Sequence, residues 1–102
     1  MTFSARDKED IVREVLQNLP EYAQSVDCVR WKYEQCRYTF EDDGKTTTLE
    51  LPQFLTGLDL LLASGLACVP DTTDVEDWCC QADASTVDAL IQFSLYSELI
   101  YG

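Results

Sequence analysis

The sequence predicts an α+β fold in which four to five helices pack on a two-stranded antiparallel hairpin. Apolar residues recur at helical spacing in several separate segments, and one central segment alternates apolar and polar residues around a tight-turn motif. With 102 residues, the chain has the length of one domain, so we expect a single acidic domain over residues 1–102. Apolar residues make up 46% of it, which is typical of a folded chain.

The first helix is the clearest element. Ser4, with Asp7 three residues later, has the form of a capping box. The apolar residues that follow fall on one helical face as far as Leu19, and Pro20 ends the helix or opens the next one.

Residues 21–30 are predicted to form a second, shorter helix, because their apolar residues lie on one side at helical spacing. The next segment is ambiguous, since Tyr33 continues that spacing whereas Tyr38 and Phe40 alternate as in a strand. We place the change from helix to strand near Glu34.

Residues 36–42 and 46–51 are predicted to form the β-hairpin. Gly44 supplies the positive φ that a tight turn needs, and the threonine-rich run after it is β-branched. An isolated hairpin is only marginally stable in water, so we expect this one to pack on the helices.

Two helices follow the hairpin. Pro52 suits the first turn of one helix, and Gly65 is a plausible stop for it. Thr73 and Glu76 form a second capping-box pattern, which predicts a short acidic helix.

The last helix is predicted to begin at an Asp83 or Ser85 cap and to run to about Ile100. Apolar residues surround nearly its whole circumference. Such a helix is either central to the core or shared with a partner.

Charge is distributed unevenly along the chain. Nineteen acidic residues outnumber seven basic ones, for a net charge of −12, and residues 46–102 contain nine acids and no base. Such a surface repels nucleic acid and anionic membranes and attracts basic surfaces. We therefore predict a basic protein partner, with no direct binding to nucleic acid or membrane. The alternative is that the charge serves solubility alone.

The residue types argue against an enzyme. Without histidine, the chain lacks Ser-His and Cys-His pairs and the commonest metal ligand. Its five cysteines lack the paired spacing of a zinc site, and no glycine-rich phosphate loop is present. We predict no catalytic residue, metal or cofactor; a thiol enzyme using Cys80 is the remaining catalytic alternative. The polar N-terminal segment has no secretory signal, which predicts a cytoplasmic location.

Acidic side chains are the strongest functional signal. Carboxylates three or four positions apart on a helix lie about 5–6 Å apart, a spacing comparable to that of phosphates along a DNA strand. The densest candidates for partner binding are Asp71, Asp74, Glu76, Asp77 and Asp83, and a second group on the hairpin is Glu41, Asp42, Asp43 and Glu50. Candidate aromatic anchors are Trp31, Tyr33, Trp78, Tyr96 and Tyr101, with core packing the favoured role for Trp78.

In size, charge and lack of catalytic residues, the chain resembles small acidic proteins of phages and mobile elements, including anti-CRISPR and anti-restriction proteins. This resemblance is one of composition, without a shared residue motif. It implies an inhibitor that presents carboxylates where phosphates would lie. One alternative is an immunity protein or antitoxin that caps a nuclease toxin. Another is a structural or assembly protein that forms a homodimer through the last helix.

Overall fold

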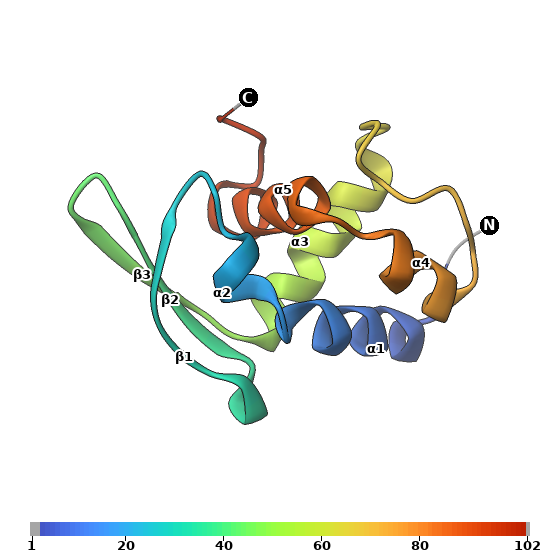
Figure 1. Ribbon diagram of the computed structural model, residues 1–102, viewed down its shortest axis with the longest axis horizontal. Coiled ribbons are helices and arrows are strands. Elements are labelled where there is room, and N and C mark those ends of the chain that lie inside the picture. The colour runs from blue at the N-terminus through green and yellow to red at the C-terminus, as the bar shows by residue number, and fades with distance from the viewer. Residues whose placement is uncertain (1–2, 102) are drawn as a thin grey trace.

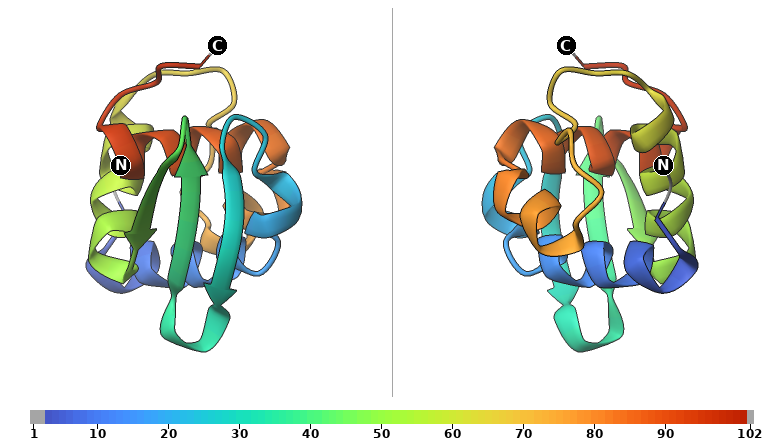
Figure 2. Two further views of the ribbon diagram at one scale, coloured as in Figure 1. Left: turned by 90° about the vertical axis from the view of Figure 1, so that its left-hand side faces the viewer. Right: turned by 90° about the vertical axis from the view of Figure 1, so that its right-hand side faces the viewer.

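Helices cover one face of a three-stranded antiparallel sheet in the computed structural model, which describes residues 3–101 (Figure 1). The strands lie in the order β1 (Asp27–Lys32), β2 (Arg37–Asp42) and β3 (Lys45–Leu49), and a one-turn 3-10 helix, η1 (Tyr33–Gln35), joins the first two. The opposite face of the sheet has no helix in front of it (Figure 2).

Helix α5 crosses α3 on the covered side of the sheet and is the central helix of the fold, as its composition predicts (Figure 1). It packs most extensively against α3 and also contacts α2 and β3, while α1 packs against α3 and α4. The expectation of four to five helices on an antiparallel sheet is therefore confirmed. The α-helices are α1 (Ala5–Leu16), α2 (Leu19–Tyr22), α3 (Leu51–Ala63), α4 (Val75–Gln81) and α5 (Ala84–Tyr96).

Two aromatic side chains on the inner face of β2 tie the sheet to the helices. Tyr38 and Phe40 are 0% and 1% exposed. The Tyr38 hydroxyl donates a hydrogen bond of 2.6 Å to the carbonyl of Leu16, and its ring meets Phe54 edge-on with centroids 5.8 Å apart. Trp78 on α4 is also buried, which confirms its assignment to the core.

Helices α3 and α5 approach so closely that only glycine fits at their contact. A Cβ at Gly57 would lie 2.9 Å from the backbone N and Cα of Ser94. The Ser94 hydroxyl turns back to donate to the carbonyl of Leu90 at 2.7 Å, so it needs no partner on α3. Because residue 57 is glycine, the two helices that dominate the core can pack at this close spacing.

One carboxylate is built into the core. Asp88 on α5 is 8% exposed, and it accepts hydrogen bonds from the backbone N–H groups of Gln24 and Ser25 at 3.0 and 2.8 Å. The Ser25 hydroxyl and the Gln92 amide donate to it at 2.6 and 3.0 Å. Burial raises the pKa of Asp88, but these hydrogen bonds outweigh burial and hold the pKa below its ordinary value.

The structure corrects the prediction for residues 21–30. Helical structure there ends at Tyr22, and β1 adds a third strand to the predicted hairpin. The apparent helical face was a coincidence of spacing, because Val26 is buried whereas Val29 is 44% exposed. The hairpin itself, formed by β2 and β3, is confirmed with a turn at Asp43 and Gly44.

The two capping boxes predicted from the sequence differ in outcome. The capping box of Ser4 and Asp7 is present, with reciprocal hydrogen bonds of 3.1 and 3.2 Å. The cap of α4 is Asp74, one residue after the predicted Thr73, and its side chain accepts from the N–H of Asp77 at 2.9 Å. Both residues are good helix caps, so the pattern alone could not choose between them.

The last helix begins at one of its two predicted caps and ends four residues before the predicted end at Ile100. Asp83 is the cap, and Tyr96 is the final helical residue because Ser97 adopts a left-handed conformation with φ of 61°. The segment after it folds back, and the Gln92 side chain accepts from the backbone N–H groups of Ile100 and Tyr101. Packing within the chain accounts for the apolar character of α5, so a homodimer through this helix stays an untested prediction.

Candidate functional site: an acidic groove between two helices

A groove of about 860 Å³ runs between α1 and α4. Asp10 and Glu14 of α1 and Asp74 and Glu76 of α4 line it. We call this surface the acidic groove. Its other lining residues are Arg13, Tyr33, Val75, Cys79 and Cys80.

The amphipathic pattern of α1 and the anchoring of α4 bring the four carboxylates together. Asp10 and Glu14 are one turn apart, about 6 Å along the axis, on a side of α1 that its buried residues leave free. Trp78 fixes α4 in the core, and α4 packs directly against α1. Asp74 and Glu76, in the first turn of α4, therefore lie beside the α1 carboxylates.

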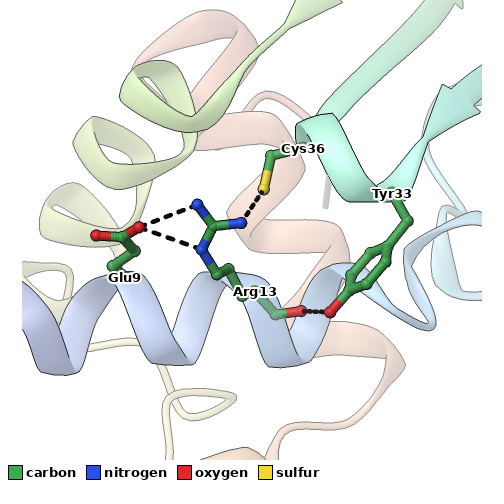
Figure 3. A network of polar contacts seen from close by, with 4 residues as sticks. All are labelled: Glu9, Arg13, Tyr33 and Cys36. Carbon is green, nitrogen blue, oxygen red and sulfur yellow. Dashed lines mark hydrogen bonds and ion pairs between the residues drawn. The ribbon is translucent and has the colours of Figure 1, made fainter.

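The one cation lining the acidic groove is already engaged. Arg13 forms an ion pair with Glu9 at 3.0 Å, and its other terminal nitrogen donates to the Cys36 sulfur at 3.2 Å (Figure 3). Within residues 3–101, none of the four groove carboxylates forms an ion pair. The groove therefore carries a concentrated negative charge.

Tyr33 forms a rigid wall of the acidic groove. Its hydroxyl donates to the backbone carbonyl of Arg13 at 3.1 Å (Figure 3). The same hydroxyl accepts from the Gln17 amide at 3.2 Å. These bonds hold η1 against α1. Tyr33 is 36% exposed, so it offers an aromatic surface beside the carboxylates.

The chemistry of Cys79 reflects the charge around it. Burial raises the pKa of this thiol to about 11, and the carboxylates of Glu14 and Asp10 add to the increase. Cys79 is therefore a neutral thiol at neutral pH and lacks the thiolate that a cysteine nucleophile requires.

The structure separates the first predicted group of acids. Asp74 and Glu76 lie in the acidic groove, whereas Asp77 is exposed on α4 outside it. Asp71 lines a separate hollow. Asp83 is engaged as the cap of α5, and hydrogen bonds from the first turn of that helix lower its pKa.

The second predicted group, on the hairpin, is not a uniform acidic patch. Asp42 accepts hydrogen bonds from the hydroxyls of Tyr96 and Tyr101. Both bonds lower the pKa of Asp42, and the bond from Tyr96 has the larger effect. Glu50 pairs with Arg37 at 3.0 Å and caps α3. Of the four acids in this group, only Glu41 and Asp43 are exposed and without an ion pair in the described part of the chain.

The sequence interpretation missed Asp10 and Glu14. Their spacing of four residues was visible, but acids on the free side of an amphipathic helix usually face only water. Their role as one wall of a groove depends on α4, which begins about 60 residues later in the chain. A contact at that separation has no local signal in the sequence.

Comparison with known proteins adds no further constraint, because no family model, no curated protein and no solved structure matches this chain. Among the described residues, no helix combines the length and apolar character that crossing a bilayer requires. No group of three or more His, Cys, Asp or Glu side chains in residues 3–101 is arranged to hold a metal ion. The function is therefore argued from the acidic groove itself.

Proposed function

We propose that this chain is a binding protein that blocks a basic nucleic-acid-binding protein, with the acidic groove as its docking surface. The observation that carries the proposal is the set of four carboxylates on two packed helices, none of which has an ion-pair partner among residues 3–101. Burying such a cluster against neutral surface would cost free energy, whereas a basic surface would compensate it.

The spacing of the groove carboxylates supports mimicry of nucleic acid. Asp10 and Glu14 repeat at one helical turn, a distance comparable to the spacing of phosphates along a DNA strand. Asp74 and Glu76 supply a second row on a helix that is fixed in the core by Trp78. A rigid double row of negative charge can occupy a groove that a basic protein uses for a nucleic-acid backbone.

An immunity protein or antitoxin directed at a basic nuclease would use the same electrostatics. The two hypotheses differ in the partner and not in the docking surface. Identification of the partner therefore separates them, and the following experiment serves both.

The test begins with the chain immobilised at low salt in a bacterial lysate, and the captured protein is identified by mass and purified. Its binding to a fluorescent DNA duplex is then followed by anisotropy as the free chain is added. We expect the chain to displace the duplex, and 1 M salt to reduce its binding to the partner because the screening length falls to about 3 Å.

Two variants of equal net charge locate the docking surface. The groove variant combines Asp10→Asn, Glu14→Gln, Asp74→Asn and Glu76→Gln, and asparagine preserves the α4 cap. We expect it to inhibit about 100-fold less well, because each exposed ion pair contributes about 0.5–1 kcal/mol. The control variant neutralises four exposed acids outside the groove, and we expect it to inhibit within about threefold of wild type. Its changes are Glu21→Gln, Glu41→Gln, Asp43→Asn and Glu98→Gln.

Three outcomes would contradict the proposal. Equal losses in the two variants would mean that net charge alone drives binding. A larger loss in the control would move the docking surface away from the groove. Capture of a partner whose duplex binding is unaffected would remove mimicry of nucleic acid.

A further inference from the structure

Positive charge gathers on the outer face of the sheet, although the chain as a whole is strongly acidic. Tyr38 and Phe40 face the core. Successive side chains of a strand alternate in direction, so Arg37 and Thr39, which precede each of them, face outward. Arg30 pairs in register with Thr39, and Lys32 pairs with Arg37, which places both on the same outer face. Three of the seven basic residues thus lie within one small area that no helix covers (Figure 2).

These residues line a hollow of about 370 Å³ together with Trp31. We call it the basic hollow; its lining is Arg30, Trp31, Lys32, Arg37 and Thr39. Trp31 is 52% exposed, the highest fraction among the large apolar side chains in the described residues. Trp31 pairs in register with Tyr38, so its indole lies on the other face of β1 from Arg30 and Lys32, at the edge of the sheet. Tryptophan and arginine are both enriched at binding hot spots.

One cation of the hollow already binds a carboxylate. Nε and Nη2 of Arg37 donate to a single oxygen of Glu50 at 3.2 and 3.0 Å. Arg30 and Lys32 have no ion-pair partner within residues 3–101. The surface therefore displays the chemistry of carboxylate binding at one cation and leaves two neighbouring cations free.

The basic hollow lies beside a free edge of the sheet. β1 pairs with β2 on one side, and no described strand lies on its other side. The bulge between Cys28 and Arg30 leaves Arg30–Lys32 as the regular part of the strand. Along that part, the side chains read cation, indole, cation, and the two cations lie about 6.6–6.8 Å apart, as alternate residues of a strand do.

We propose that the basic hollow binds a short extended segment of a partner protein in which acidic and apolar residues alternate. A segment lying along the free edge of β1 would place two carboxylates opposite Arg30 and Lys32 and an apolar side chain against Trp31. This site goes beyond the proposed function, since it uses β1 and β2 and needs neither helix of the acidic groove.

The observations favour a peptide over a nucleic acid. A polyanion of many phosphates is repelled by the net charge of −12, whereas a segment with two or three carboxylates interacts mainly with the local cations within the screening length of about 8 Å. The area is also small: Glu41 follows Arg37 on the same face after four residues, about 13 Å along β2, and begins the acidic end of the sheet.

The test uses the two tryptophans as probe and internal reference. A tryptophan-free peptide, Ac-Ser-Glu-Leu-Glu-Phe-Glu-Ser-NH2, is titrated into the chain while emission and acrylamide quenching are recorded. We expect saturable protection of Trp31 from quenching, with the buried Trp78 unchanged. The same peptide with glutamine in place of glutamate should give no saturable change.

A pair of variants with equal charge assigns the binding to the hollow. Arg30→Gln with Lys32→Gln should weaken peptide affinity at least tenfold. Arg6→Gln with Lys45→Gln removes two exposed charges outside the hollow and should change it less than twofold. The groove variant described above should bind the peptide at least as well as wild type, so failure at one site is distinguishable from failure at the other.

The proposal is overturned if both double variants weaken binding alike, if the glutamine peptide binds as tightly as the glutamate peptide, or if Trp31 is not protected. A ten-residue oligothymidylate is the competing probe. Tighter binding of that oligonucleotide than of the glutamate peptide would assign the hollow to single-stranded nucleic acid and also overturn the proposal.

Discussion

Asp88 and the acidic groove show two opposite uses of carboxylates in one chain. The oxygens of Asp88 accept four hydrogen bonds from Gln24, Ser25 and Gln92, so this group is fully engaged inside the fold. The groove carboxylates lie at the surface without ion-pair partners in the described residues. Net charge does not distinguish these roles. Burial does: Asp88 is 8% exposed and stabilises the fold, whereas the groove carboxylates are exposed, where another molecule can reach them.

The largest expected effect tests the buried side of this comparison. Asp88→Ala removes the acceptor for two backbone N–H groups, together with the acceptor for the Ser25 hydroxyl and the Gln92 amide. We expect the free energy of unfolding to fall by about 3 kcal/mol or more, as measured by urea denaturation. Asp77→Ala, an exposed acid outside the groove, is the matched control and should change it by less than about 0.5 kcal/mol. Similar losses of unfolding free energy in both variants would contradict the distinction between buried and exposed carboxylates.

Acid should weaken the same network. The pKa of Asp88 is lower in the folded chain than in the unfolded chain, so its stabilising effect is complete above the ordinary carboxyl pKa of about 3.9 and is lost as the pH falls through the folded value. We expect the difference in unfolding free energy between wild type and Asp88→Asn to be constant from pH 7 to 5. It should then shrink below about pH 4. Urea denaturation at each pH measures it, and a constant difference down to pH 3 would contradict this assignment.

A smaller effect is expected on the thiol beside the groove. Asp10→Asn with Glu14→Gln removes two carboxylates that raise the pKa of Cys79 above its ordinary value, while burial, the larger cause, remains. The pKa should therefore fall from about 11 and stay above the ordinary thiol value. Alkylation rate against pH, with the modified peptide mapped by mass in a Cys80→Ser background, measures it. An unchanged pKa would mean that the carboxylates do not act across the groove.

The smallest effect is expected for the stability of the groove variant. Its four carboxylates form no ion pairs in the described part of the chain, and neutralising them relieves repulsion between like charges. We expect the free energy of unfolding to change by less than about 0.5 kcal/mol, or to rise slightly. A loss of 2 kcal/mol or more by urea denaturation would show that these acids stabilise the fold.

The sequence was sufficient wherever one element carries its own signal. The Ser4 cap, the hairpin turn and the central position of α5 all follow from local residue patterns. The strand β1 was missed because it lies at the sheet edge with nearly all of its side chains exposed, so it shows no alternation of apolar and polar residues. Its side chains Val29 and Trp31 are apolar yet face solvent.

The candidate site was only half predictable for a related reason. Asp74 and Glu76 stood out because they lie in a run of acids, while Asp10 and Glu14 resembled any solvated helix face. Asp42 was grouped with the free acids because its tyrosine partners, Tyr96 and Tyr101, lie more than 50 residues away. Pairings across the fold decide which charges remain available, and such pairings have no local sequence signal.

The position of α5 in the chain has a consequence for biosynthesis. This helix fills the centre of the core, yet it is translated after the sheet and the other four α-helices of the described residues. Asp88 on it binds backbone N–H groups more than 60 residues earlier in the chain. The sheet and the first helices leave the ribosome with their apolar faces uncovered. We therefore expect nascent chains that stop before residue 84 to remain open to proteases and chaperones, and resistance to appear abruptly once α5 has emerged.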